Sequence, residues 1–219
     1  LNIWTKSLDK EKRMPVIVWL HGGGYAAGSA IEHIAYDGFN MCMNGDAVVV
    51  SINHRLNILG YLDLSPFGEK YKNSGNAGHA DMVAALKWIH DNISLFGGDP
   101  ENVTVFGQSG GGMKVADLMQ IEEADGLFHR GFIMSGVSDA SLLPPCTGDG
   151  REIVTQMLKE LGISENEVEK LETVPYYELV HAYEKVSPAV AAQGGYIGGS
   201  PLVNDYFKGN PLDYGFRQH

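Results

Sequence analysis

The chain has 219 residues, of which 44% are hydrophobic and 20% are charged, and this composition is typical of a globular domain that buries a sizeable core. Its formal net charge is −11 at pH 7. Nucleic-acid binding through phosphate contacts needs clustered Lys and Arg, so we expect no nucleic-acid partner.

The two cysteines, Cys42 and Cys146, lie far apart and form no CxxC pair, which argues against a disulfide framework and against a zinc site. We expect two free thiols, with a single bridge as the alternative. No apolar run approaches the ~18 residues of a membrane span. The stretch LNIW at the start resembles part of a strand, without an initiator Met or the apolar core of a signal peptide, so we expect the chain to begin inside a larger protein.

Four short apolar segments predict buried strands, because each is rich in β-branched or aromatic residues and apolar on both faces. They are residues 15–20, 47–53, 102–108 and 130–137. Continuous apolar strands of this kind are typical of a parallel sheet that is covered on both sides.

A helix is predicted over residues 80–96, where apolar residues recur at spacings of three and four, and Gly97 ends it. A second helix is predicted directly after Ser109. The alternation of strands and helices predicts an α/β fold, a mostly parallel sheet flanked by helices in a doubly wound arrangement.

The character of the sequence changes after residue 140. An amphipathic helix is predicted over 151–161, another with a capping box formed by Ser164 and Glu167, and a third over 175–186. We expect a core over 1–140, a helical lid or insertion over 141–195, and an irregular tail over 196–219.

Ser109 lies in the pattern G-x-S-x-G, between a predicted strand and a predicted helix. That context predicts a nucleophile elbow, a sharp turn in which the serine adopts strained backbone angles and projects its hydroxyl above the sheet. Side chains at the flanking positions would collide with the backbone, so Gly107 and Gly111 are required. The following helix N-terminus favours an anion at the site.

The run His21-Gly22-Gly23-Gly24 follows the first predicted buried strand. Glycine amides without side chains can converge on a developing oxyanion, together with the N–H of the residue after the nucleophile. The sequence therefore predicts Ser109 as the catalytic nucleophile. It predicts Gly23, Gly24 and Gly110 as the oxyanion hole.

The stretches PVIVWLHGGGYAAGS, GNAGHADMVAALKWIHDNISLFGGDPENVTVFGQSGGG and LFHRGFIMSG resemble type-B carboxylesterases, the esterase and cholinesterase group of α/β-hydrolases. The resemblance is strong over residues 1–137 and weaker beyond them. It implies an α/β-hydrolase fold, incomplete here at both ends, and a serine carboxylesterase that needs no metal or other cofactor. It further implies a small-molecule ester as substrate.

The elbow departs from the family pattern. The family usually has Glu-Ser-Ala where this chain has Gln108-Ser109-Gly110. Gln108 lacks a negative charge that could orient the catalytic base. Gly110 keeps the amide donor but is expected to make the elbow looser.

A serine hydroxyl needs a base, and in this fold the acid and then the histidine follow the serine along the chain. In the family both lie farther downstream than this chain extends, so we expect the chain to be a fragment that is nearly inactive by itself. Three histidines follow Ser109. His129 is expected to pack before a strand, His181 is expected on a solvated helix face, and His219 is the terminal residue. His21 is expected to brace the glycine run. We assign none of these as the base, nor any of the others that precede the elbow: His33, His54, His79 and His90.

Two alternatives stay open. A non-catalytic cholinesterase-like binding or adhesion domain would share the fold, although such domains characteristically lose the elbow serine. Thioester, lactone or amide cleavage would use the same elbow. The acyl pocket would discriminate among these substrates, and its candidate lining is Tyr25, Phe39, Tyr61, Leu62 and Phe67. The sequence leaves the natural ester, the compartment and the oligomeric state open.

Overall fold

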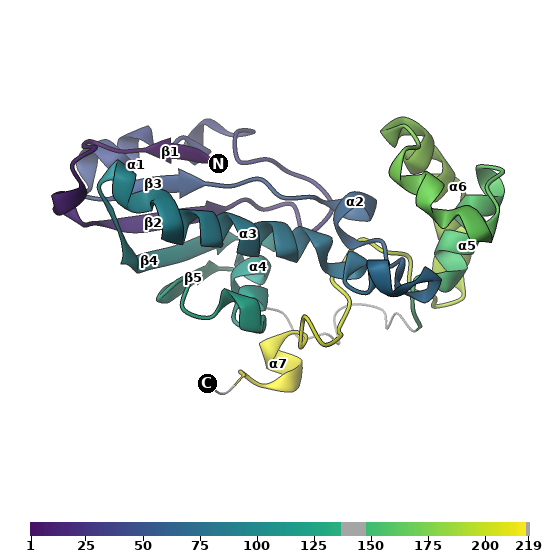
Figure 1. Ribbon diagram of the computed structural model, residues 1–219. Helices are drawn as coiled ribbons and strands as arrows, with labels where there is room; N and C mark the ends of the chain where they lie inside the picture. Colours follow the sequence, from purple (N-terminus) through teal and green to yellow (C-terminus); the bar gives the residue numbers. More distant parts are fainter. Residues whose placement is uncertain (137–147, 218–219) are drawn as a thin grey trace.

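The structure, a computed structural model, describes residues 1–136 and 148–217. Its centre is a five-stranded sheet with the order β1-β3-β2-β4-β5 (Figure 1). The strands are β1 (Asn2–Trp4), β2 (Met14–Leu20), β3 (Val48–Ser51), β4 (Gly98–Gln108) and β5 (Arg130–Met134). β1 pairs with β3 in antiparallel fashion, and the other three pairings are parallel, which confirms the predicted mostly parallel sheet.

All four predicted strands are present, and the LNIW segment adds β1. β3 is buried along its whole length, and β2 and β4 contribute Val16, Val18, Val103 and Val105 to the core without any exposed surface. The expectation of a buried strand is wrong for β5. Its first residues are exposed, including Phe132 at 58%, because β5 ends the strand order and pairs only with β4 in the described part of the chain.

Helix α3 (Ala77–Asn92) continues as a 3₁₀ turn, η6 (Ile93–Phe96), and ends at Gly97, whose φ of 74° is left-handed. This confirms the predicted helix and its glycine stop. Helix α4 (Gly110–Leu118) follows Ser109, and both helices lie in front of the sheet in Figure 1. The same core cluster takes apolar side chains from β2, β3, β4, α3 and α4. Shorter helices are α1 (Phe39–Asn44), which packs on β3, and α2 (Asn57–Tyr61).

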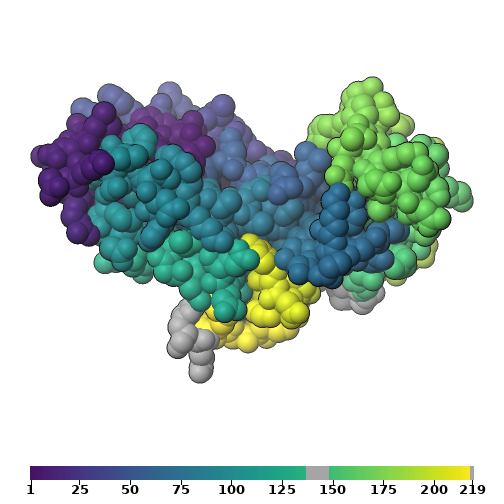
Figure 2. Space-filling view, in the orientation of Figure 1, coloured from purple at the N-terminus to yellow at the C-terminus, as the bar shows by residue number. Residues whose placement is uncertain are grey.

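Residues 151–192, which we call the helical lobe, form α5 (Arg151–Glu160), the 3₁₀ segment η9 (Glu165–Glu172) and α6 (Tyr176–Ala192). A second core cluster joins these helices to the α2 region. Figure 2 shows a hollow between the lobe, in green, and the rest of the molecule.

Two expectations for the lobe are wrong. Ser164 stands at the N-cap of η9 but its side chain caps nothing, because Glu167 has non-helical backbone angles and pairs with Lys170 instead. α6 is longer than predicted and continues through Pro188, four residues before its end.

The tail beyond the lobe is irregular apart from α7 (Pro211–Tyr214). It is fixed to the core: Phe207 belongs to the sheet cluster, and the Gln120 side chain bonds to Gly215 and Arg217. The boundary expected at residue 140 lies outside the described residues, as does Cys146, whereas Cys42 is a buried free thiol. Within the described ranges, no helix combines the length and the apolar character that a bilayer span requires.

Candidate active site

Ser109 occupies the junction between β4 and α4 with φ of 55° and ψ of −122°, a conformation that costs energy in any residue with a side chain. Two backbone hydrogen bonds hold it there. Its N–H donates to the carbonyl of Met134 at 3.0 Å, and its carbonyl accepts from Met113 N at 3.1 Å. The residue is exposed to solvent. The chain therefore holds a strained, accessible serine at the carboxyl edge of the sheet.

The glycines around Ser109 allow backbone to pack directly on backbone. A Cβ added to Gly107 would lie 2.4 Å from the carbonyl carbon of Gly111. A Cβ added to Gly111 would lie 2.1 Å from the carbonyl oxygen of Leu20 at the end of β2. Both distances are far below van der Waals contact, so the predicted reason for glycine at these positions is confirmed.

The segment from His21 to Tyr25, here called the glycine loop, lies against the elbow. A Cβ on Gly22 would be 3.7 Å from the Cβ of Ser109, and a Cβ on Gly110 would be 2.2 Å from the amide nitrogen of Gly24. The structure thus brings Gly22 and Gly24 beside Ser109 and Gly110. The missing side chain of Gly110 leaves room for the loop, and the backbone of Gly24 fills that room.

The loop has a conformation that favours glycine. Gly23 and Gly24 have φ of 89° and 61°. Gly23 is turned toward Ala27, whose carbonyl oxygen would be 2.3 Å from an added Cβ. Gly23 lies in the loop as predicted, but the backbone nearest to it is that of Ala27 and not that of Ser109 or Gly110.

A buried polar cluster behind the loop was missed by the sequence reasoning. The ammonium of Lys114, which has no exposed surface, donates to the carbonyl oxygen of His21 at 3.0 Å. Asp117 Oδ2 accepts from the Tyr25 hydroxyl at 2.5 Å and lies 3.1 Å from Nε2 of His79. The available signal was a Lys and an Asp three residues apart on a helix that is otherwise apolar or glycine.

Burial governs the protonation of this cluster. It lowers the pKa of Lys114 to about 8, against the attraction of Asp117, which raises it. Burial and the Asp117 carboxylate raise the pKa of the Tyr25 hydroxyl well above its usual value. Burial also lowers the pKa of His21 and brings that of His54 to about 3, so both rings are neutral at pH 7.

None of the described histidines hydrogen-bonds to the Ser109 side chain. His129 is exposed, and its Nδ1 accepts from the N–H of Val103 at 3.2 Å, so the ring bonds to the backbone of β4 instead of packing in the interior. His181 is exposed, as expected for a solvated face, and His219 lies outside the described residues. His21 is fully buried, accepts Lys114 at its carbonyl, and stacks on His54 with ring centroids 5.0 Å apart, which confirms its bracing role.

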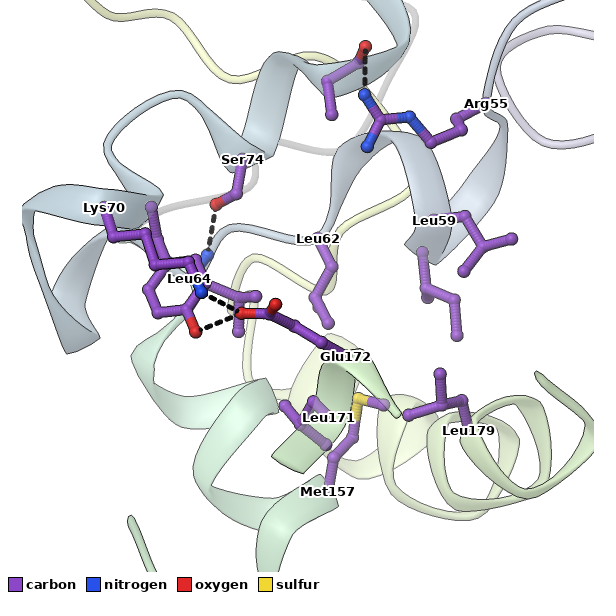
Figure 3. A pocket seen from close by; sticks show the side chains of 13 residues that line it. Arg55, Leu59, Leu62, Leu64, Lys70, Ser74, Met157, Leu171, Glu172 and Leu179 are labelled. Carbon is purple, nitrogen blue, oxygen red and sulfur yellow. Dashed lines mark hydrogen bonds and ion pairs between the residues drawn. The ribbon is translucent and has the colours of Figure 1, made fainter. Parts of the chain in front are cut away.

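A separate cavity of about 420 Å³ opens between the α2 region and the helical lobe (Figure 3). Its wall is aliphatic, with an ionic edge where Lys70 and Tyr71 meet Glu172. Of the five residues expected in an acyl pocket, Leu62 lines this cavity. Tyr61 is fully buried and Phe39 is 57% exposed. The cavity is not lined by Ser109 or by the glycine loop.

A strand–elbow–helix serine at the carboxyl edge of a mostly parallel sheet, with a glycine loop beside it, defines an α/β-hydrolase. The chain belongs to the carboxylesterase family, whose model matches residues 1–215.

Among its relatives, the para-nitrobenzyl esterase of Bacillus subtilis is 42% identical over 175 residues, which cover 80% of this chain and 34% of that protein. An esterase from Clostridium hathewayi, described as hydrolysing aliphatic aromatic polyesters, is 61% identical with a TM-score of 0.95. That match covers 99% of this chain and 43% of the other. The Geobacillus stearothermophilus carboxylesterase EST55 is 36% identical, with a TM-score of 0.79, over 97% of this chain and 44% of its own. The chain thus spans less than half the length of these relatives.

Proposed function

We propose that this chain is the nucleophile-bearing part of a serine carboxylesterase. The observation that carries the proposal is the exposed serine with positive φ at position 109, beside the glycine loop. Family membership supports the same chemistry. An adhesion or binding role is not favoured, because such a role requires neither a strained serine nor a glycine loop packed against it.

In the proposed reaction the Ser109 Oγ attacks the ester carbonyl and forms a tetrahedral oxyanion. The amides of Gly23, Gly24 and Gly110 are the proposed donors to that oxygen, and each such donor typically contributes about 3 kcal/mol to the transition state. The intermediate expels the alcohol and leaves an acyl-serine. Water then attacks the acyl-serine, releases the carboxylic acid and restores the hydroxyl.

The attack requires a base that takes the Ser109 proton and returns it to the leaving alcohol. None of the described histidines hydrogen-bonds to Ser109, so we propose that the base and its carboxylate partner are other residues of the complete protein. The chain by itself would then retain only the residual catalysis that the oxyanion donors and substrate binding provide.

The proposed substrates are small carboxylic esters. Related proteins bear names that refer to a para-nitrobenzyl ester and to aliphatic aromatic polyesters, which indicates esters with an aromatic group as the first to test. No cofactor enters the proposed steps.

The test is pre-steady-state hydrolysis of p-nitrophenyl acetate by the protein encoded by the complete reading frame that contains these residues. An acyl-serine predicts a burst of p-nitrophenol of about one equivalent per active site. The Ser109→Ala variant should show no burst and should lose about 10⁶-fold in kcat. A burst that survives in Ser109→Ala would refute the assignment of the nucleophile.

A further inference from the structure

Helix α4 directs two buried charged side chains toward the glycine loop. Lys114 has no exposed surface and Asp117 has 3%, although such residues are almost never fully buried without a partner. They stand three residues apart on the helix and so lie on one face. The helix that begins at the nucleophile therefore carries a cation and an anion into the interior next to the loop.

The two side chains bind the two ends of the loop. Lys114 Nζ donates to the carbonyl oxygen of His21 at 3.0 Å, and Asp117 Oδ2 accepts from the Tyr25 hydroxyl at 2.5 Å. His21 and Tyr25 are the residues that flank Gly22, Gly23 and Gly24 in sequence. Each bond involves a charged group, and such bonds are stronger than those between neutral groups.

The loop needs restraints of this kind because three glycines in succession are conformationally free. Other hydrogen bonds of the loop are either within the loop or to a different helix. His21 Nδ1 lies 2.8 Å from the Gly22 carbonyl oxygen, and the Tyr25 carbonyl accepts from the N–H of Asn57, the first residue of α2, at 2.7 Å. The bonds from Lys114 and Asp117 differ from these because they tie the loop to the same helix that positions Ser109.

A further layer supports the anion. His79 on α3 places Nε2 3.1 Å from Asp117 Oδ2, and the His79 ring stacks on Phe207 with centroids 5.0 Å apart. The titratable groups that face Lys114 from the surrounding segments are His21, His54, Asp117 and the more distant Glu32. Lys114 and Asp117 thus balance each other's charge within the buried cluster.

We propose that Lys114 and Asp117 are positioning residues that clamp both ends of the glycine loop to the nucleophile's helix. This inference rests on the proposed esterase function. Neither side chain is proposed to touch the substrate. Their effect is to keep the loop amides at the distance from Ser109 that a developing oxyanion requires, and a misplacement of about 1 Å in such a site costs about 100-fold in rate.

The test uses the full-length protein with p-nitrophenyl acetate and three variants: Lys114→Met, Tyr25→Phe and the double variant. Tyr25→Phe removes one hydroxyl and preserves the ring, so it is the variant that is expected to fold without difficulty. Each single variant should lower kcat by about 10- to 100-fold with KM within about threefold, because the oxyanion contact matters only in the transition state. The double variant should lose much less than the product of the single losses, because both bonds hold one loop.

The control is Val115→Ala, which removes apolar volume from a fully buried position on α4 that belongs to the sheet core cluster. It should lower the melting temperature and leave kcat within about twofold, because its packing is independent of the loop.

Unchanged kcat in Lys114→Met and Tyr25→Phe would overturn the clamp, and so would an equal loss of kcat in Val115→Ala. These outcomes are separable from failure of the proposed function. The clamp fails alone if Ser109→Ala abolishes hydrolysis while the loop variants do not alter it. The proposed function fails if Ser109→Ala remains active.

Discussion

The elbow region and the helical lobe are built by different means. Around Ser109 the contacts are between backbones, and added Cβ atoms at Gly110 and Gly111 would lie 2.2 Å and 2.1 Å from the nearest backbone atom. In the lobe the contacts are between aliphatic side chains from α5, η9 and α6, and a Cβ at Gly162 would meet nothing within 4 Å. The elbow also buries Lys114 and Asp117, whereas the lobe's charged residues form exposed ion pairs such as Lys185–Glu160.

This difference indicates how each region should respond to change. A clash between an added Cβ and a backbone atom about 2 Å away cannot be relieved by rotating a side chain, so the elbow glycines should tolerate almost no substitution. A core of aliphatic side chains can relax around a change, so the lobe should lose stability gradually. The proposed chemistry lies at the elbow, the region that should tolerate fewer substitutions.

The largest effect is expected for Gly111→Ala. In an ordinary helix interior this change stabilises by about 1 kcal/mol. Here the new Cβ would collide with the Leu20 carbonyl, and the free energy of unfolding should fall by more than about 3 kcal/mol, at or beyond the usual range for overpacking. Chemical denaturation followed by circular dichroism measures it.

The matched control is Gly162→Ala in the lobe, where φ is 67° and space is open. It should cost about 1 kcal/mol, from the left-handed backbone alone. Equal losses in the free energy of unfolding for Gly111→Ala and Gly162→Ala would contradict the contrast between the two regions.

The next effect is expected for Met157→Ala, which empties a fully buried position in the lobe. We expect a loss of about 3 kcal/mol from removed contacts and the cavity left behind. The burst with p-nitrophenyl acetate should keep its amplitude, since Met157 touches neither the elbow nor the loop. Loss of the burst in a folded Met157→Ala protein would contradict the separation of the two regions.

A pH effect is expected at Lys114. Its pKa is about 8 in the folded protein, against 10.5 without burial. Between these values the unfolded chain binds the proton that the folded chain has released, so this group makes stability rise with pH. From pH 8 to 10.5 the free energy of unfolding of the wild type, measured relative to Lys114→Met, should increase by up to about 3 kcal/mol. A pH-independent difference would show that the Lys114 pKa is not lowered by burial.

The smallest effect is expected for Lys70→Met, which breaks an exposed ion pair with Glu172 at 2.6 Å on the edge of the cavity. Solvent screens such pairs, so thermal denaturation should show almost no change. A drop in melting temperature comparable with that of Met157→Ala would show that the ionic edge, and not the aliphatic wall, holds the lobe to the α2 region.

The sheet, the helix over 80–96 and the elbow could be predicted from the sequence, because each depends on a local pattern: apolar strands, periodic helix residues, and glycines around a serine. The exposure of β5 could not be predicted, because it depends on which strands flank β5 in space. The capping box at Ser164 failed because Glu167 pairs with Lys170 and leaves helical geometry.

The buried polar cluster around Lys114 could not be predicted from local sequence patterns, for a different reason. Lys114 and Tyr25 are far apart in sequence, and their contacts with the loop and the helix arise only when β2 and α4 pack. Charged residues on a short helix are usually solvated, so nothing in their spacing alone distinguishes a clamp from a surface pair.

The central claim, that Ser109 is an activated nucleophile facing the glycine loop, is tested most directly by covalent labelling. The full-length protein is treated with a fluorophosphonate, digested, and mapped by mass spectrometry, with Ser109→Ala treated in parallel. The account predicts one adduct, on the peptide that contains Ser109, and none in the variant. An adduct on another residue, or none in the wild-type protein, would contradict it.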